Sequence, residues 1–397
     1  MISAEKALEI ILNQTKNFGT ETIPFKNSLG RILKENITAD RDFPPFDRAS
    51  MDGIAICMNT FNAGTKSYPI EGIQAAGTAQ LTLQNKDNCI EVMTGAMAPK
   101  NTDVVVPYEL ITIKNGIAKI NISEVKYFQN IHKKGLDRKK EDLLIKTNTV
   151  ISAAEIGVLA TVGKAEVLVA KNPKIIIIST GDELVPVKQT PQNYQIRRSN
   201  VHTLVSLLES FKIAADTIHI ADDKVLLKQK IISILNTYDV LLFSGAVSKG
   251  KFDFLPEIFD EIGVSKLFHK VKQRPGKPFW FGKKASKTIF AFPGNPVSTF
   301  VSCMKYFYPW YKKTMGITFK NPHFAVLASD FNFKPDLTYF LQVHLENKSG
   351  TLYATPIVGN GSGDLANLLD SNAFLELPTG KQLFQKGEVF PFIKYHN

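Results

Sequence analysis

The chain has 397 residues, of which 44% are hydrophobic and 21% charged, and its formal net charge is +11 at pH 7. This length suits about two to four domains, and the ordinary apolar and charged balance excludes an intrinsically disordered chain. The basic excess favours anionic partners such as phosphorylated small molecules, or reflects only a Lys-rich surface. The Lys residues are scattered without the aromatic interleaving of an RNA-binding surface, so we expect no nucleic acid partner.

Three features of the chain indicate a cytoplasmic protein without membrane contact. The cysteines are odd in number and far apart, which argues against a disulfide framework or a zinc knuckle and favours a reducing compartment. The first 18 residues lack the basic n-region of a signal peptide. No apolar stretch approaches the roughly 20 residues that a membrane span needs.

The N-terminal part begins with a helical pattern, because apolar residues share one face after a possible N-cap at Ser3: Ala4, Ala7, Leu8 and Ile11. A strand is expected at residues 22–25. From about 54 to 140, short β segments alternate with turn residues, and Asn115-Gly116 is a hairpin signal. We therefore predict a β-rich domain inserted into another unit, followed by a helix at 151–162 and a strand at 166–169.

The pattern changes at Pro173, where apolar strands begin to alternate with helices. Strands are expected at 175–178, 218–220, 240–243 and 289–292, and helices at 200–211, 224–235, 254–262 and after Pro296. This alternation predicts a doubly wound α/β sheet. Further strands at 324–327, 339–345, 352–355 and 373–377 predict a C-terminal β domain, so the fold class is multi-domain α/β plus β.

Four polar clusters, three of which contain glycine, follow the expected strands of the α/β region, where open α/β sheets bind ligands. The clusters are Ser179–Glu183, Asp222-Asp223, Ser244–Ser248 with Asp253, and Pro293–Pro296. Glycines let backbone N–H groups approach an anion, and carboxylates from separate loops can hold Mg²⁺ beside a phosphate. One such cluster is more often a helix cap, with Asp222 as an ordinary N-cap, but four at successive strand ends favour a phosphate site.

A basic turn, Arg274–Pro278, places two cations around a turn whose two prolines have rigid φ angles, which suits an oxyanion. Taken alone, such a turn is more often simply solvated. The Gly-rich loop around Ser362 is not a G-x-G-x-x-G fingerprint, and no Walker A sequence occurs. The seven histidines are dispersed without metal-ligand spacing and are expected to be structural or exposed.

Taken in order, these motifs resemble the molybdopterin molybdenumtransferases, the MoeA and gephyrin E-domain family. The match includes residues 45–55, 93–96, 99–109 and 135–144, the strand-end clusters, the basic turn and the Ser362 loop. The resemblance implies four domains. These are an α/β molybdopterin-binding domain (1–20 and 172–318), an N-terminal linking domain (21–39 and 141–171), an inserted β-rich domain (40–140) and a C-terminal β domain (319–397).

The resemblance also implies the last step of molybdenum cofactor synthesis, in which adenylylated molybdopterin and molybdate give the cofactor and AMP. It implies Mg²⁺ and an elongated homodimer whose partner subunit completes the site. Transient contacts with molybdopterin adenylyltransferase and with recipient molybdoenzymes would accompany this role.

The residues that match the family's functional positions fall into three sets. The expected catalytic residues are Asp52, Thr94, Glu183, Asp222, Asp253, Lys270, Arg274 and Ser362. The expected substrate-binding residues are Ser179, Thr180, Gly181, Asp182, Ser244, Gly245, Ser248, Pro275, Gly276, Lys277, Pro293, Gly294 and Asn295. The expected Mg²⁺ ligands are Glu183, Asp222 and Asp253.

Four positions depart from the family pattern, and none removes an expected carboxylate. Ala246 stands where glycine is usual, Arg274 for lysine, Ile54 for tyrosine and Gln342 for arginine. Three alternatives remain: a molybdopterin adenylyltransferase, which would need only residues 172–318, a scaffold protein, and a carrier that binds molybdate or pterin without releasing AMP.

Overall fold

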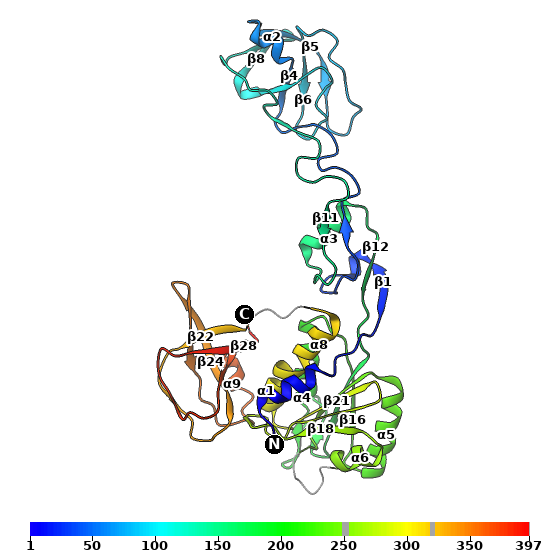
Figure 1. The fold of residues 1–397 in the computed structure, drawn as a ribbon, viewed down its shortest axis with the longest axis vertical. Coiled ribbons are helices and arrows are strands. Elements are labelled where there is room, and N and C mark those ends of the chain that lie inside the picture. Colours follow the sequence, from blue (N-terminus) through cyan, green and yellow to red (C-terminus); the bar gives the residue numbers. More distant parts are fainter. Residues whose placement is uncertain (248–253, 318–321, 397) are drawn as a thin grey trace.

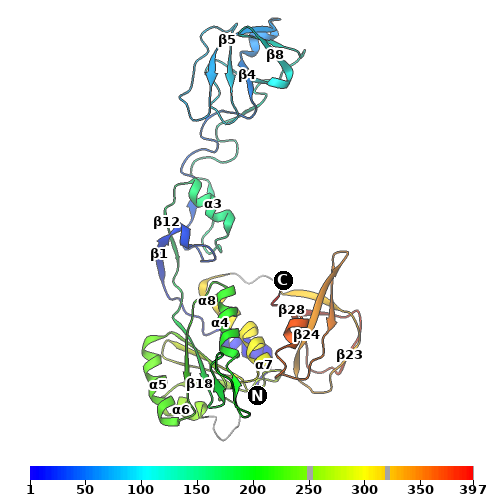
Figure 2. The same ribbon diagram turned by 180° about the vertical axis from the view of Figure 1, so that it is seen from behind.

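The computed structural model describes residues 1–247, 254–317 and 322–396, which form an elongated molecule (Figure 1). The α/β part and the C-terminal β part lie next to each other at one end. The inserted β-rich part lies at the far end, with a small linking part between them, and the view from behind shows the same arrangement (Figure 2). No helix in these described ranges is long and apolar enough to cross a membrane.

The α/β sheet has six strands in the order β16-β13-β17-β21-β20-β18. Four strands are parallel: β13 (Ile175–Thr180), β16 (Asp216–Ile220), β17 (Val240–Ser244) and β21 (Lys287–Phe292). Two antiparallel strands, β20 (Trp280–Lys284) and β18 (Ser265–His269), complete one edge. Strand-and-helix alternation did not predict this antiparallel edge, because no helix separates β18 from β20.

Both faces of this sheet are covered by helices, as the alternation predicted. Ile175 and Ile177 pack in one apolar cluster with α1, α4, α7, η3 and α8, whereas Ile176 and Ile178 pack in a second with α5 and α6. Successive strand residues point to opposite faces, so an uninterrupted apolar strand must be buried on both. The helices are α1 (Ala4–Leu12), α4 (Asn200–Ser210), α5 (Lys224–Thr237), α6 (Leu255–Glu261), α7 (Pro296–Ser302), the π-helix η3 (Cys303–Phe307) and α8 (Tyr308–Met315).

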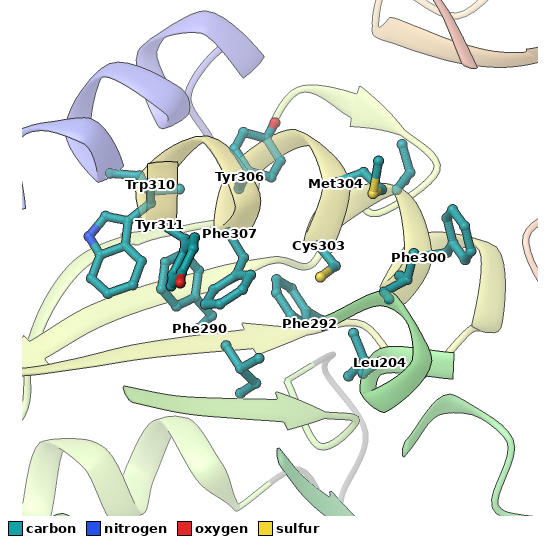
Figure 3. Packing of buried hydrophobic residues seen from close by; sticks show 14 of the residues in the cluster. Leu204, Phe290, Phe292, Phe300, Cys303, Met304, Tyr306, Phe307, Trp310 and Tyr311 are labelled. Carbon is teal, nitrogen blue, oxygen red and sulfur yellow. The ribbon is translucent and has the colours of Figure 1, made fainter. Parts of the chain in front are cut away.

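The α7-η3-α8 segment supplies a largely aromatic core. Phe307 packs edge to face against Phe290 of the sheet, with ring centroids 5.6 Å apart. In Figure 3, Phe307 points toward the strand that carries Phe290, whereas Tyr306 points away from it. The predicted cap of α1 is confirmed, since the Ser3 side chain accepts a hydrogen bond from the backbone N–H of Lys6 at 3.1 Å.

The linking part is built from segments on both sides of the inserted domain. It contains β1 (Thr20–Pro24) paired with β12 (Glu166–Ala170), β2 (Ile37–Thr38) paired with β11 (Leu143–Ile145), η1 (Phe25–Asn27) and α3 (Ala153–Thr161). Ser152 and Glu155 form a capping box at the start of α3. Lys34 connects this part to the α/β part, because its Nζ donates a hydrogen bond of 2.8 Å to the Met315 carbonyl at the end of α8.

The inserted part is a six-stranded sheet in the order β7-β4-β6-β5-β9-β8. Asn115 and Gly116 have positive φ angles of 50° and 74° and join β8 to β9, which confirms the predicted hairpin. The elements are β3 (Arg48–Ala49), β4 (Gly53–Ile56), α2 (Met58–Asn62), β5 (Ser67–Gln74), β6 (Cys89–Val92), β7 (Val104–Pro107), η2 (Tyr108–Leu110), β8 (Ile111–Lys114), β9 (Ile117–Ile120) and β10 (Ile131–His132).

The C-terminal sheet has the order β19-β24-β25-β22-β28-β26, and its first strand comes from within the α/β segment of the chain. The elements are β19 (Gln273–Arg274), β22 (His323–Leu327), β23 (Phe331–Asn332), β24 (Thr338–Lys348), β25 (Thr351–Pro356), α9 (Asn367–Asp370), β26 (Ala373–Leu377), β27 (Leu383–Phe384) and β28 (Val389–Lys394). A shielded ion pair of 2.6 Å between Lys305 Nζ and Glu376 connects this part to η3. Through β19, Arg274 at the start of the basic turn pairs with β24 of this sheet.

Candidate functional site

A cavity of about 820 Å³ opens at the carboxyl ends of β13, β17 and β21. This is where an open α/β sheet presents its loops to a ligand, and the volume is that of an ordinary small-molecule site. The sequence-predicted residues that line it are Ser179, Thr180, Gly181, Glu183, Asp222, Ser244, Gly245, Arg274, Pro275, Gly276, Lys277, Pro293, Gly294, Asn295 and Ser362.

At the end of β13, the buried Ser179 hydroxyl lies 3.0 Å from Nδ1 of His219 on β16. Burial, assisted by the positive charge of Arg198, lowers the pKa of His219 below its usual 6.5. The imidazole is therefore neutral near pH 7. Sequence reasoning treated the histidines as structural or exposed and did not single out His219, which is half-buried behind the cavity wall.

Asn200, the first residue of α4, holds two of the strand-end loops together. Its Nδ2 donates to Ser244 Oγ at 2.9 Å and to the Gly294 carbonyl at 2.7 Å. Sequence reasoning missed this residue and the cavity-lining Arg197 and Arg198. A polar residue at the start of a helix that follows the first strand-end loop is the signal that could have found Asn200.

Ala246, one of the departures from the family pattern, lines the same cavity. Its φ angle is 55°, in the left-handed region where a Cβ is unfavourable and glycine is not. The structure thus explains why glycine suits this position: the backbone conformation itself favours it, in addition to the space that a methyl group removes from the cavity.

The carboxylates at the cavity have distinct partners. Asp223, not Asp222, is the N-cap of α5: its side chain accepts the Leu226 N–H at 2.7 Å, so the reading of Asp222 as an N-cap was wrong. Asp222 lines the cavity together with Glu183. Asp182 does not line it; its Oδ1 accepts the backbone N–H of Asp222 at 3.1 Å and supports that loop from behind.

Gly181 makes room for one of these carboxylates. Its φ angle is 129°, and a Cβ added there would lie 2.4 Å from Glu183 Oε2. A glycine at this position is therefore required for Glu183 to fold back over the turn at the end of β13.

The loop of the C-terminal part contacts the cavity directly. Asn295 Nδ2 donates to Ser362 Oγ at 2.7 Å, and the Ser362 carbonyl accepts the Val297 N–H at the start of α7 at 3.1 Å. Arg274 and Ser362 also line a smaller neighbouring cavity of about 160 Å³, whose wall includes Gln342. The departure at Gln342 thus lies beside the basic turn.

Like Asp182, the predicted residue Lys270 lies outside the cavity wall, and two further predicted residues are not described. Lys270 is not among the lining residues; its backbone N–H donates to the Phe279 carbonyl at 2.9 Å. Ser248 and Asp253 lie outside the described residues. Within residues 1–247, 254–317 and 322–396, no three His, Cys, Asp or Glu side chains are grouped as a metal site, so the predicted Mg²⁺ trio stays a prediction.

Asp52 and Thr94 lie in the inserted part, at the far end of the molecule from the cavity (Figure 1). Asp52 Oδ1 accepts hydrogen bonds from the Thr94 backbone N–H at 2.6 Å and from its hydroxyl at 2.7 Å. These bonds lower the pKa of Asp52, the backbone bond most, so this exposed carboxylate is ionised at neutral pH.

Comparisons with known proteins agree with this arrangement along nearly the whole chain. Models of the MoeA N-terminal region (domain I and II) and the MoeA C-terminal region (domain IV) match residues 2–163 and 325–395. A model described as "Probable molybdopterin binding domain" matches residues 176–313. A Synechocystis protein named molybdopterin molybdenumtransferase is 39% identical over 397 residues, covering 99% of both chains.

The chain belongs to the MoeA family. A MoeA-family relative from Bacillus subtilis, also named molybdopterin molybdenumtransferase, is 30% identical and covers 98% of this chain and 93% of its own. The crystal structure of the molybdopterin biosynthesis MoeA protein from Pyrococcus horikoshii has 28% identity, a TM-score of 0.83 and full coverage of both chains. The family resemblance and the fold class drawn from the sequence are thereby confirmed.

Proposed function

We propose that this chain is a molybdopterin molybdenumtransferase, which inserts molybdenum from molybdate into adenylylated molybdopterin and releases AMP. The observation that carries the proposal is the cavity itself. In a chain of the MoeA family, it combines strand-end hydroxyls, two carboxylates and a basic turn at the carboxyl edge of the α/β sheet. Its volume of about 820 Å³ lies within the range of small-molecule and cofactor sites.

Each group of lining residues has a separate proposed task. Ser179, Thr180 and Ser244 offer hydroxyl groups, and Gly181 and Gly245 give backbone access to the phosphates of the adenylylated pterin. Arg274 and Lys277 neutralise an oxyanion, either a substrate phosphate or molybdate itself. Ser362 brings the C-terminal part to the same cavity.

Glu183 and Asp222 provide oxygen ligands of the kind that Mg²⁺ prefers, and both line the cavity. We propose that they hold Mg²⁺, together with Asp253 as the third carboxylate. When bound, the ion would neutralise charge on the pyrophosphate and so favour cleavage of its P–O bond. Asp182 would position this pair through its hydrogen bond to the Asp222 backbone.

A homodimer is part of the proposal. Asp52 directly precedes β4 and Thr94 follows β6 in the inserted part, which lies far from the α/β part of the same chain (Figure 1). Their expected catalytic role therefore requires a second subunit that presents its inserted part to the cavity. Contacts with molybdopterin adenylyltransferase and recipient molybdoenzymes, a cytoplasmic location and the four-domain boundaries stated above belong to the same proposal.

The decisive experiment is AMP release from adenylylated molybdopterin by the purified full-length protein, with molybdate and Mg²⁺ supplied together and omitted singly. We expect release only when both are present. Asp222→Asn and Glu183→Gln should reduce release at least about a hundredfold, the size of effect typical for loss of a catalytic electrostatic group. A carrier would bind the pterin without releasing AMP in any of these mixtures, and that result would overturn the proposal.

A further inference from the structure

The side chain of Gln273 contacts the basic turn and is completely buried, and the residue is among those that line the cavity. Its Nε2 donates to the Pro275 carbonyl at 3.1 Å and lies 3.4 Å from the Gly276 carbonyl, while its Oε1 accepts the hydroxyl of Tyr306. Carbonyl oxygens can only accept hydrogen bonds, so the amide orientation is fixed by its partners. Neither the sequence motifs nor the proposed function gave this residue a task.

Tyr306 keeps the Gln273 amide in this orientation. It is fully buried on η3, and burial raises the pKa of its hydroxyl far above the usual value. The hydroxyl therefore stays protonated at neutral pH and donates to Oε1. Figure 3 shows Tyr306 on the side of the helix that does not face Phe290, and its ring packs against Phe279 with centroids 5.0 Å apart.

The orientation of the amide determines the orientation of the turn. The peptide bonds that follow Pro275 and Gly276 are trans, so each N–H points opposite to the carbonyl of its own peptide. With both carbonyls directed at Gln273, the N–H groups of Gly276 and Lys277 point away from it. In the described part of the chain, neither N–H donates a hydrogen bond to a protein acceptor.

Two further features fix the turn against Gln273. A Cβ on Gly276 would lie 2.7 Å from Gln273 Nε2 and 3.0 Å from Ser302 Oγ, so only glycine allows this close approach. Gln273 lies in β19 and pairs with Thr338 of β24 in the C-terminal sheet. Lys277, at the other end of the turn, contacts the α/β part, because its carbonyl accepts the Val271 N–H at 2.9 Å. Gln273 therefore lies at the junction of the two domains.

We propose that Gln273 is a positioning residue that turns the N–H groups of Gly276 and Lys277 toward the cavity and so sets the affinity of the basic turn for a tetrahedral oxyanion. Successive N–H groups at a glycine turn form a concave anion site, and the Arg274 and Lys277 side chains add charge to it. The inference rests on the proposed function and deepens it, because the oxyanion is either molybdate or a phosphate of the adenylylated pterin.

The test compares the full-length protein with Gln273→Met, which keeps the side-chain volume and removes both halves of the amide. We expect binding of the oxyanion, measured by calorimetry with inorganic molybdate and with pyrophosphate, to weaken about tenfold, the effect of losing one or two hydrogen bonds. The steady-state KM should rise for the substrate that carries the affected anion, with kcat changed less than about twofold, as for lost uniform binding. A rise in the molybdate KM assigns molybdate to the turn, and a rise in the pterin KM assigns the phosphate.

The control is Tyr311→Phe. Like Tyr306, Tyr311 is a buried tyrosine on the η3-α8 segment, but its hydroxyl donates to Asn172 Oδ1 at 2.8 Å and does not contact the turn. Equal anion affinities in the wild type, Gln273→Met and Tyr311→Phe would overturn the inference. If Gln273→Met does not fold, Tyr306→Phe replaces it: weakened anion binding supports the positioning role, and unchanged binding contradicts it. Arg274→Ala distinguishes failure of the Gln273 inference from failure of the proposed function. Unchanged anion binding in Arg274→Ala would contradict the proposed role of the basic turn in binding an oxyanion.

Discussion

Asp52 illustrates how a single hydrogen-bonding neighbour sets the charge state of a carboxylate. Two bonds from Thr94 lower its pKa below the usual 3.8. A carboxyl group whose pKa is lower in the folded chain contributes stability above its unfolded pKa, and this contribution is lost as the pH falls through the folded value. Asp52 is therefore ionised throughout the neutral range.

Thr94→Val should raise the pKa of Asp52 toward 3.8, because it removes the hydroxyl bond and leaves the backbone N–H bond in place. A carbon-13 NMR titration of the Asp52 carboxyl group measures this directly. Thr102→Val is the control, since its hydroxyl bonds the Pro99 carbonyl at 2.7 Å in the same domain. An unchanged pKa in Thr94→Val would show that the hydroxyl bond does not form in solution.

At the scale of elements, α5 shows how two adjacent aspartates divide a structural and a chemical task. Asp223 accepts the Leu226 N–H and caps the helix, whereas Asp222 lines the cavity at the end of β16. The sequence presents two equivalent carboxylates at the start of a helical pattern. Which one is the cap depends on where the backbone leaves the strand and enters the helix.

Asp223→Ala should destabilise the α/β part by about 1 kcal/mol, the usual contribution of an N-cap, and lower its Tm by roughly 2–4 °C. AMP release should change little. Asp222→Asn should show the converse: nearly unchanged thermal unfolding, with activity lost. Calorimetry of both variants beside the activity assay checks the division, and an equal loss of Tm in both would contradict it.

For the molecule as a whole, the separation of the inserted part from the cavity decides how a complete site can form. If one subunit supplies the cavity and its partner supplies Asp52, two inactive variants can complement each other. A mixed dimer of Asp52→Ala and Asp222→Asn then contains one intact site, formed by the Asp222 of one subunit and the Asp52 of the other.

Co-expressed Asp52→Ala and Asp222→Asn should therefore recover about a quarter of wild-type activity, since half of randomly formed dimers are mixed and each has one working site. Separately purified homodimers of each variant should be inactive and serve as controls. No recovery in verified mixed dimers would mean that each cavity uses the Asp52 of its own chain, or that Asp52 has no role in the reaction.

Local sequence patterns were enough to predict the α/β architecture and many residues of the cavity wall. The apolar run at residues 175–178 predicted a strand buried on both faces, and the two clusters that it joins confirm this. The polar clusters at the strand ends could be recognised from the sequence, because turns depend on the residue types within a few positions of one another. Parallel strands bring their carboxyl ends to one edge, so these clusters could be expected to meet there.

Only the tertiary structure showed the contacts between segments that are distant in the chain. Gln273 belongs to the C-terminal sheet although it lies within the α/β segment, and Tyr306, its partner, is 33 residues away. Asn200 joins two loops that lie 44 and 94 residues after it in the chain. Periodicity and turn signals report on residues close in the chain, whereas these hydrogen bonds depend on which elements pack together. The sequence therefore predicted residues of the cavity wall but not the side chains, such as Gln273 and Asn200, that hold the wall in place.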